Sequence, residues 1–563
     1  MDDGYISTCS RILGEVLEGE IKPWNHQLET WRALREHAGE KVVVLKAPTA
    51  SGKTEAATIP YFYQATSGDW FLAPGLIYVL PNKTLLFSQL KRLRSIRERL
   101  GLKGKISVVA DIGGIYPEKT FLFGDIVLTT LDAFAYGLFA KRTFLVSEDE
   151  TLGKTLFPSG NIATSYLIFD EVQIYQDEAY YIPRILGKLL MFLHNAGVPI
   201  VVMTATLPKV LEETLLGDVA PNIEIIVQEK SRRGCVEVSL EPLKGGINIL
   251  EAAKDRRFLG DILANHNRIL LCCNTVRRAV ELYRYIVSNR DVEESGYKVM
   301  LLHSKFINNT RRSREAQLER FREKLKKSMR ELRLIVIATQ VIESGVDFSF
   351  DCVLTELCPI DALIQRIGRC SRSEGEKGDA LIFSIPNPKP YGKDVITKTR
   401  RILLDYEDRI AEALNRLEIS QELLDRVYTD LPPLTDYAAR RYSETLKTLS
   451  ALSPNIDPLY YNPQVRLDPY ITVIFIETFS GEEMICVDSM RIIEENHFNV
   501  EYHGRDLEKY PFLNIHGRAV EVEKISRDNS KICIEVRYVD RIYPGKTYIL
   551  NPEAYDRDTG LRI

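Results

Sequence analysis

Short apolar runs rich in valine, isoleucine and leucine recur between residues 41 and 384, with stretches of helical periodicity between them. The first series comprises KVVVL (41–45), LIYVL (76–80), DIVL (125–128), SYLIFD (165–170) and PIVVM (199–203). The second series comprises RILLCCN (268–274), KVMLLH (298–303), LRLIVIAT (332–339), CVLTE (352–356) and DALIFS (379–384). Continuous apolar strands that alternate with helices are typical of parallel sheets covered on both faces. The pattern predicts two tandem α/β domains, which we place at residues 1–230 and 231–395.

The pattern changes twice after residue 395. The segment TRRILLDYEDRIAEALNRLE (399–418) is charged and amphipathic, so we expect a helical linker over residues 396–465. Strand-like runs then follow one another closely: ITVIFIETF (471–479), MICVDSM (484–490), AVEVEKI (519–525), KICIEVRYV (531–539) and KTYIL (546–550). They predict a small, mostly β C-terminal domain over residues 466–563.

Composition places the chain among ordinary globular proteins, with 45% hydrophobic and 27% charged residues in 563. The first residues, MDDGYISTCS, are neither basic nor apolar, and no apolar run approaches the ~20 residues that cross a bilayer. The nine cysteines show no CxxC or Cys/His spacing. We therefore expect a cytoplasmic protein without a membrane segment, with reduced thiols and no structural zinc.

The net charge of -4 does not by itself indicate nucleic-acid binding. Two local runs are nevertheless strongly basic, at residues 91–105 and 311–333. Each run is either the solvated face of a helix or part of a nucleic-acid path, and the composition leaves both alternatives open.

The strand KVVVL leads directly into APTASGKT (47–54), which matches the phosphate-binding pattern GxxxxGK[ST] with alanine in place of the first glycine. Gly52 would let the backbone approach phosphate, Lys53 would reach the β- and γ-phosphates, and the Thr54 hydroxyl would hold Mg²⁺. The sequence thus predicts ATP and Mg²⁺ as cofactors. The candidate contacts in this turn are Ala50, Ser51, Gly52, Lys53, Thr54 and Glu55.

A second acidic element, SYLIFDEV, ends an apolar strand with Asp170 and Glu171. Alone, such a pair is a common solvated strand end. After a phosphate-binding turn in the same α/β domain, it predicts that Asp170 completes the Mg²⁺ shell and that Glu171 orients or deprotonates the attacking water.

The stretch QRIGRCSR (365–372) places Arg369 and Arg372 three residues apart, a spacing that predicts one shared helix face. A solvated basic face is the simple interpretation. Alternatively, arginines from a second domain stabilise the charge that builds up on a transferred phosphoryl group. In that case the two domains close around the nucleotide, and hydrolysis is coupled to domain movement.

Six segments in order resemble motifs I, Ib, II, III, V and VI of superfamily 2 helicases: APTASGKT, TTLDA (129–133), DEVQ (170–173), TATLP (204–208), ATQVIESGVD (338–347) and QRIGRCSR. The resemblance covers roughly residues 23–375 and implies that both α/β domains are RecA-like. It further implies roles for six residues. Gln27 would read adenine unless it is a surface glutamine, Asp347 would touch the ribose, and Gly345 would also bind the nucleotide. Gln365 would contact the γ-phosphate or the attacking water, and Thr204 and Thr206 would couple nucleotide state to the other domain.

Within that superfamily the chain most resembles the helicase–nuclease of type I CRISPR interference, the Cas-three family. The supporting segments are PTASGKTEAA, LPNKTL (80–85), SYLIFDEVQIY (165–175), CNTVRRA (273–279), LLHSKF (301–306) and VIESGVDFSFD (341–351). Two positions depart from the family: Gln173, where histidine is more usual, and the pair after Pro81, where Thr-Arg is more usual.

The family resemblance implies a nucleic-acid path across both α/β domains. The matching positions are Thr84, Thr129, Thr130, Asn274, Thr275, His303, Ser304 and Thr339. Hydroxyl and amide groups of this kind suit contacts to phosphates, which position a strand without reading its sequence. For His303, within an apolar run, a satisfied core histidine is the alternative.

The fused members of the family carry a metal-dependent HD nuclease, whereas this chain has eight histidines and no His-Asp dipeptide. The resemblance therefore implies an ATP-dependent single-stranded DNA helicase, moving 3′ to 5′, that works with a separate HD nuclease subunit and a Cascade-like surveillance complex. Two alternatives remain: an RNA helicase of the same superfamily, and an ATP-gated clamp that recruits a nuclease without unwinding.

Overall fold

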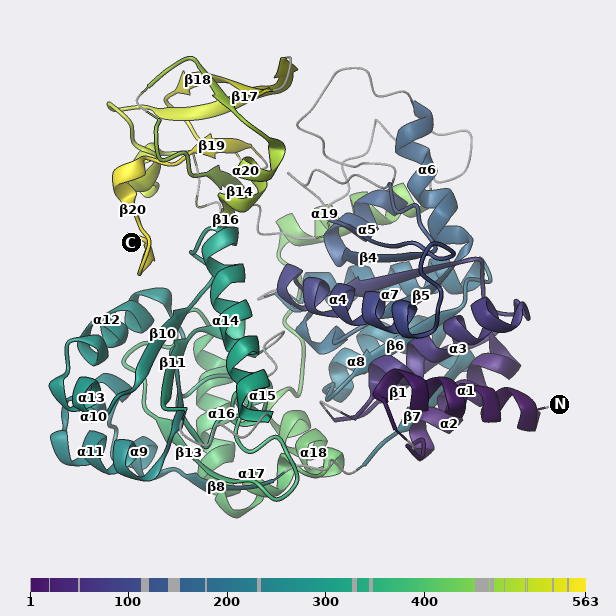
Figure 1. Cartoon of the computed structure of the whole chain (residues 1–563), viewed down its shortest axis with the longest axis horizontal. Helices are drawn as coiled ribbons and strands as arrows, with labels where there is room; N and C mark the ends of the chain where they lie inside the picture. The colour runs from purple at the N-terminus through teal and green to yellow at the C-terminus, as the bar shows by residue number, and fades with distance from the viewer. Residues whose placement is uncertain are drawn as a thin grey trace. The chain divides into compact units, whose positions relative to one another are not determined.

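The structure is a computed structural model of the whole chain, shown in Figure 1. It describes residues 2–19, 21–48, 51–112, 121–139, 152–177, 180–229, 234–326, 332–343, 348–450, 465, 470–479, 481–501, 503, 505–528, 531–543 and 546–562. These residues form two compact units. The first is built from described residues within 1–231 and 415–467, and the second from those within 232–414 and 468–563.

The first unit is centred on a seven-stranded, wholly parallel sheet with the order β3-β4-β2-β5-β6-β1-β7. Its strands are β1 (Val42–Lys46), β2 (Gly75–Leu80), β3 (Val108–Asp111), β4 (Ile126–Thr130), β5 (Ser165–Phe169), β6 (Ile200–Thr204) and β7 (Ile223–Val227). Every residue of β4, β5 and β6 is buried, as expected for strands covered on both sides.

Helices cover both faces of this sheet because successive strand residues point to opposite sides. Val43 and Leu45 pack with one group of helices, and Val42 and Val44 with the other. The first group is α1 (Asp2–Leu17), α2 (Asn25–His37), α3 (Lys53–Ser67) and α4 (Lys83–Arg99). The second group includes α5 (Leu131–Leu138), α7 (Tyr181–Asn195), α8 (Lys209–Leu216) and α19 (Asp436–Ser450).

The second unit contains a six-stranded parallel sheet with the order β10-β11-β9-β12-β13-β8. Its strands are β8 (Cys235–Ser239), β9 (Arg268–Cys272), β10 (Lys298–Leu302), β11 (Leu334–Ala338), β12 (Cys352–Glu356) and β13 (Lys377–Phe383). The helices that accompany it are α9 (Glu241–Lys244), α10 (Ile249–Lys254), α11 (Arg256–Asn265), α12 (Val276–Val287), α13 (Arg290–Glu294), α14 (Asn308–Lys326) and α15 (Ile360–Ile367).

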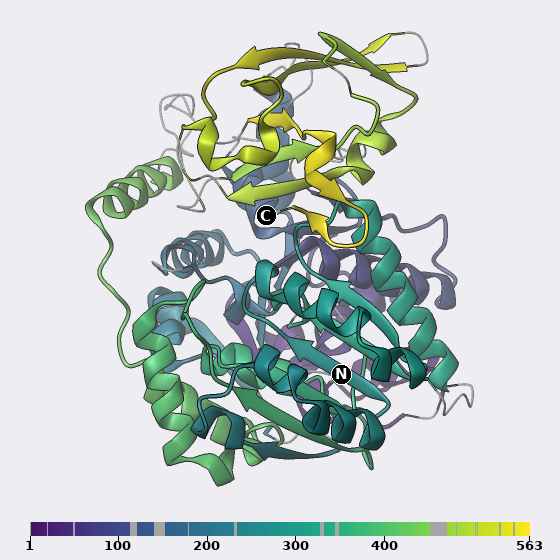
Figure 2. The same cartoon turned by 90° about the vertical axis from the view of Figure 1, so that its left-hand side faces the viewer.

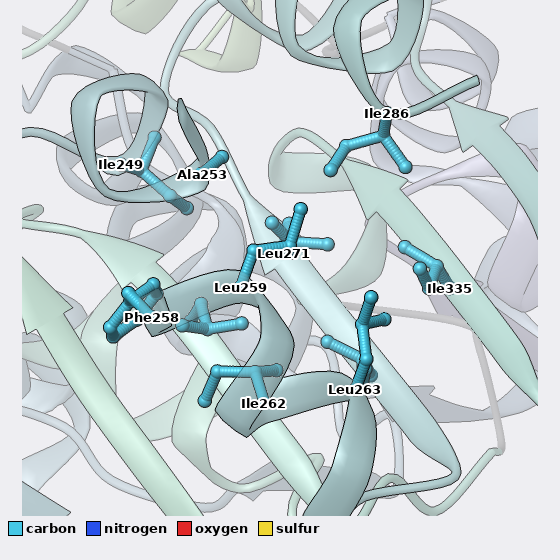
Figure 3. A pocket seen from close by; sticks show the side chains of 11 residues that line it. Ile249, Ala253, Phe258, Leu259, Ile262, Leu263, Leu271, Ile286 and Ile335 are labelled. Carbon is cyan, nitrogen blue, oxygen red and sulfur yellow. The ribbon is translucent and has the colours of Figure 1, made fainter. Parts of the chain in front are cut away.

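A small cavity inside this second sheet domain is lined only by apolar side chains (Figure 3). They come from the sheet and from α10, α11 and α12, and the side chains in contact with the cavity are Ile249, Ala253, Phe258, Leu259, Ile262, Leu263, Ile269, Leu271, Ile286, Ile335 and Leu354. The lining presents no group that could bind a phosphate or a metal. It is a packing gap in the domain core, apart from the predicted chemistry.

The C-terminal strands, yellow-green to yellow in Figures 1 and 2, form a six-stranded mixed sheet with the order β15-β18-β17-β19-β14-β16. They are β14 (Tyr470–Ile474), β15 (Met484–Val487), β16 (His497–Glu501), β17 (Ala519–Asp528), β18 (Lys531–Val539) and β19 (Thr547–Ile549). A disulfide joins Cys486 and Cys533, which face each other in the β15–β18 pair. For these two cysteines the expectation of reduced thiols is wrong; the other seven are free.

The predicted fold class is confirmed: two parallel α/β domains, a helical segment and a mostly β C-terminal domain. The helical segment does not form one body, however. Its helices α16 (Lys393–Asp405) and α17 (Glu407–Ala413) belong to the second unit, and α18 (Leu417–Val427) and α19 belong to the first. Among the described residues, no helix is both long enough and apolar enough to span a bilayer.

Candidate nucleotide and motor site

The turn between β1 and α3 has the geometry of a phosphate-binding loop. Gly52 caps α3 with a φ of +80°, a conformation that favours glycine. A Cβ at this position would lie 2.6 Å from Nε2 of Gln27, so the glutamine amide would have to move to make room for it. The helix that begins at Lys53 directs free backbone N–H groups and a positive dipole end toward the turn, where anions bind. The predicted contact Ala50 lies outside the described residues.

Gln27 is buried under this turn, with 3% of its side chain exposed. Its Nε2 donates to the Gly52 carbonyl at 3.2 Å, and its Oε1 accepts from the Trp24 amide at 3.0 Å. The surface-glutamine alternative is therefore wrong. The amide instead joins α2 to the turn, and its contact with adenine stays a prediction.

Lys53 and Ser51 supply the polar groups inside the turn. Lys53 Nζ donates to the Ala47 carbonyl at 2.8 Å and lies 3.6 Å from Oε1 of Glu171. Ser51 Oγ is buried and has no hydrogen-bond partner among the residues that the structure describes. A buried hydroxyl without a partner is costly. An anion bound at the end of α3 would satisfy it, so the turn fits a nucleotide phosphate.

Asp170 follows β5 and is 4% exposed. Its Oδ2 accepts from the Tyr78 hydroxyl at 2.7 Å. Burial, together with the neighbouring charge of Glu171, raises the pKa of Asp170 to about 7. A buried carboxylate beside a second carboxylate is an environment that a divalent cation stabilises. The hydroxyl of Thr54, 3.4 Å from Nε2 of Gln89, begins the adjacent helix and offers a second oxygen ligand of the kind that Mg²⁺ prefers.

Glu171 is linked to the end of β6 through the side chain of Gln173. Nε2 of Gln173 donates to Glu171, and its Oε1 accepts from the Thr204 hydroxyl at 2.7 Å. The same hydroxyl lies 3.2 Å from the Thr206 carbonyl. Glu171 itself has a φ of +50°, a strained conformation for a non-glycine residue and one that is common at functional sites. Gln173, which departs from the family pattern, thus joins Thr204 to Glu171, and the Thr204 hydroxyl in turn lies against the Thr206 carbonyl.

Several arginines of the basic run at residues 91–105 form hydrogen bonds or ion pairs within the first unit. Arg92 on α4 forms an ion pair with Glu55, which is 1% exposed. Three further arginines donate to backbone carbonyls: Arg94 to Val108 at 3.1 Å, Arg97 to Ile106 at 3.5 Å and Arg99 to Val16. Arg92, Arg94 and Arg99 are nevertheless exposed, as a solvated helix face predicts, and contact of this run with nucleic acid stays a prediction.

In the second unit, the arginines of QRIGRCSR do not share a helix face. The helix α15 ends at Ile367, and residue 370 pairs with Phe350 instead. The Phe350 amide donates to the Arg369 carbonyl at 3.0 Å, and the Ser371 amide donates back to Phe350 at 2.9 Å. This extended pairing turns Arg369 and Arg372 out of the helix, so the helix-face prediction is wrong.

Three predicted residues of this stretch have different settings. Gln365 lies on α15 and is half-buried. Arg369 is 7% exposed, and its Nη2 donates to the Glu343 carbonyl. Arg372 is half-buried, and its backbone amide donates to Ser349 Oγ at 3.0 Å. The predicted nucleotide-binding residues Gly345 and Asp347 lie outside the described residues.

Arg366, which the sequence argument did not single out, is the centre of a buried polar network. Its Nε pairs with Glu343 Oε1 at 2.8 Å, its Nη1 donates to Asn274 Oδ1 at 2.8 Å, and its Nη2 donates to the Tyr391 hydroxyl at 3.1 Å. A signal was present in the sequence, because Arg366 falls among Leu363 and Ile367 on the buried side of an amphipathic helix.

The positions predicted for nucleic-acid contact differ widely in exposure. Ser304 is exposed, and Thr84 and Thr275 are half-buried near the beginnings of α4 and α12. The remaining five are buried with at most 9% exposure: Thr129, Thr130, Asn274, His303 and Thr339. The Asn274 side chain already donates to the Leu357 carbonyl at 2.8 Å as well as accepting from Arg366. Contacts from all eight to a strand stay predictions.

His303 has the setting of a core histidine. Its Nε2 lies 3.1 Å from the Thr559 carbonyl, and its Nδ1 accepts from the Lys305 amide at 3.1 Å. Burial lowers the pKa of the His303 imidazole to about 3, so the ring is neutral at ordinary pH. A neutral, enclosed ring favours the core alternative over a phosphate contact.

Comparison with known proteins identifies the family. The model for DEAD/DEAH box helicases matches residues 24–214, and the model for the C-terminal part of the CRISPR-associated nuclease/helicase Cas3 matches residues 265–375. The CRISPR-associated helicase Cas3 of Thermoproteus tenax is 31% identical over 472 residues, which is 83% of this chain and 77% of that protein. The chain belongs to the CRISPR-associated Cas3 helicase family.

Other Cas3 proteins are longer. The nuclease/helicase Cas3 of Methanothermobacter thermautotrophicus is 30% identical over 434 residues, or 72% of this chain, and the matched part is 47% of that protein. The solved structure of T. fusca Cas3 with AMPPNP superposes with a TM-score of 0.62 at 18% identity, covering 90% of this chain and 67% of that one. That likeness supports the fold assignment of two RecA-like domains.

Proposed function

We propose that this chain is an ATP-dependent translocase and helicase for single-stranded DNA in type I CRISPR interference. The observation that carries the proposal is the cluster under the N-terminus of α3, where Lys53 Nζ lies 3.6 Å from Glu171 beside the buried Asp170. Combined with membership of the Cas3 helicase family, this cluster supports nucleotide hydrolysis as the source of movement.

The residues of the cluster would have different roles in binding and hydrolysis. Ser51, Gly52 and Lys53 would bind the phosphates, and Thr54 and Asp170 would hold Mg²⁺. Bound Mg-ATP supplies the phosphoanhydride bond whose cleavage drives movement. Glu171, 3.6 Å from the ammonium of Lys53, would accept a proton from water, and Gln173 would keep its carboxylate in place.

Coupling to movement requires contributions from the second unit. Arg369, Arg372 and Gln365 would face the nucleotide when the two RecA-like domains close, as arginine fingers do in related phosphoryl-transfer enzymes. The hydrogen bonds from Glu171 through Gln173 to Thr204 offer a route by which nucleotide state would reach the strand-binding surface.

The further steps of the proposal concern partners. The protein would act in the cytoplasm, move 3′ to 5′ along DNA displaced by a Cascade-like surveillance complex, and rely on a separate HD nuclease subunit for cutting.

Strand displacement on a forked duplex tests the proposal directly. The protein should release a labelled DNA strand only when ATP and Mg²⁺ are present, and Lys53→Ala should release none. Displacement of RNA strands in preference to DNA would indicate the RNA-helicase alternative. Tight, ATP-dependent binding without displacement would indicate a clamp.

A further inference from the structure

A short hairpin at the end of the chain packs against a loop of the second α/β domain, within the same compact unit. The hairpin consists of β20 (Tyr555–Asp556) and β21 (Gly560–Leu561), just before the terminus marked C in Figure 2. The loop covers residues 303–307, directly after β10. We call these segments the C-terminal hairpin (555–561) and the 303–307 loop.

Three hydrogen bonds hold the loop along its whole length. His303 Nε2 lies 3.1 Å from the Thr559 carbonyl, and the Leu561 amide donates to the Lys305 carbonyl at 3.1 Å. The Ile307 amide donates to the Tyr555 hydroxyl at 3.1 Å. Contacts at the first, third and fifth residues of the loop leave it little freedom.

The turn of the C-terminal hairpin brings Gly560 close to the 303–307 loop. Oδ1 of Asp556 accepts from the amides of Asp558 at 2.9 Å and Thr559 at 2.8 Å, which closes the turn. Gly560 then comes against the loop with a φ of +77°. A Cβ at Gly560 would lie 2.7 Å from the His303 ring and 2.8 Å from the Lys305 carbonyl, so the close approach requires glycine.

An arginine from α14 joins the two segments from the other side. The Arg314 guanidinium lies 4.1 Å from the centroid of the Phe306 ring, which in turn stacks on His303 at 4.1 Å. The same guanidinium donates to the Leu301 carbonyl at 2.6 Å and to the carbonyls of Arg557 at 3.2 Å and Asp558 at 3.0 Å. Loop, hairpin and helix are therefore tied together by one side chain.

The outcome of these contacts is a loop with a buried side and an exposed residue. His303 and Phe306 are fully buried, whereas Ser304 between them is exposed. A loop already fixed in one conformation loses less entropy when it binds a ligand than a mobile loop does. The hydroxyl of Ser304 suits a phosphate oxygen of a nucleic-acid backbone.

We propose that the C-terminal hairpin is a positioning element for strand binding: it holds the 303–307 loop in the conformation that contacts the phosphate backbone of single-stranded DNA. The C-terminal domain then takes part in binding by shaping the α/β surface. This inference rests on the proposed function, because it assumes that single-stranded DNA is the ligand of the second α/β domain.

Two glycine variants test the proposal with a matched control. Gly560→Ala introduces a methyl group into the contact, whereas Gly517→Ala changes a glycine of the same domain with a φ of +88° and open space around it. We would measure amide hydrogen exchange in the 303–307 loop and the affinity for a fluorescein-labelled oligothymidylate without nucleotide. Gly560→Ala should speed loop exchange and weaken binding by about tenfold each, and Gly517→Ala should change neither.

Tyr555→Phe provides a second, milder variant, because it removes only a hydroxyl, which accepts from the Ile307 amide and also bonds to the Thr310 side chain. Like Gly560→Ala, it should speed hydrogen exchange in the loop and weaken oligothymidylate binding, but by a smaller factor. Unchanged loop exchange in Gly560→Ala, or faster exchange with unaltered oligothymidylate affinity, would overturn the positioning role. If the wild-type protein binds no oligothymidylate, the proposed DNA-binding function fails first, and the inference fails with it.

Discussion

The Thr204 hydroxyl donates to Oε1 of Gln173 at 2.7 Å, and this bond connects the end of β6 to the segment that follows the acidic pair. The opposite end of the Gln173 amide donates to Glu171. A single side chain therefore joins the proposed water-activating carboxylate to the proposed coupling threonine.

Gln173→Ala should lower the ATP turnover rate by about tenfold, since losing hydrogen bonds to a charged group costs about 1.5–3 kcal/mol, part of it in the transition state. Nucleotide affinity should change little, because Gln173 does not line the phosphate turn. Single-turnover hydrolysis and nucleotide titration measure the two effects separately. Gln173→His serves as the control and should retain more turnover, because an imidazole can also bond to both neighbours. An unaltered rate in the alanine variant would show that the link is not used.

Lys53→Ala should abolish ATP hydrolysis while the fold is retained. Among the described residues, the ammonium bonds to the carbonyls of Ala47 and Pro48 and lies near Glu171, so its removal leaves the β1–α3 core intact. Thermal unfolding and steady-state hydrolysis should be compared on the same preparation. Full activity in this variant would contradict the assignment of the phosphate-binding turn.

Arg366→Met should destabilise the second unit by about 3–5 kcal/mol, because it leaves the largely buried carboxylate of Glu343, 14% exposed, without its ion-pair partner. Denaturant unfolding measures the change. The double variant Arg366→Met/Glu343→Leu provides the control, and it should recover most of the lost stability because no charge is left unpaired. A single variant as stable as the wild type would show that Arg366 is not a structural centre.

Arg372→Ala should affect ATP turnover and not stability, in contrast to Arg366→Met. Its side chain is half-buried, so stability should be nearly unchanged, whereas turnover should fall by as much as ~10³ if the residue acts as an arginine finger. Arg369→Ala should lower turnover similarly. Hydrolysis rates at saturating ATP decide the point: normal rates in both variants would mean that neither arginine reaches the nucleotide.

The sequence predicted most strands of the fold, and the strands that it missed have the same kind of place in their sheets. The six described strands that were missed are all at the edges of their sheets: β3, β7, β8, β16 and the two short strands β20 and β21. An edge strand such as β7 or β8 exposes some of its residues, so it lacks the continuous apolar run by which central strands were found.

The site was less fully predictable, because some of its features depend on contacts between distant segments. The end of α15 before Arg369 is set by pairing with Phe350, which no local pattern in QRIGRCSR indicates. The disulfide between Cys486 and Cys533 likewise depends on the register of β15 with β18. By contrast, the phosphate-binding turn and the acidic pair follow local strand–turn–helix rules, so their places in the fold could be read from the sequence.

The most direct test of the account is the steady-state ATP hydrolysis rate of the purified protein alone and with single-stranded DNA, single-stranded RNA or duplex DNA, with Lys53→Ala as the control. The account predicts a low rate alone, strong stimulation by single-stranded DNA and no hydrolysis by the variant. Stronger stimulation by RNA, or a rate indifferent to all three nucleic acids, would contradict a motor that moves on single-stranded DNA.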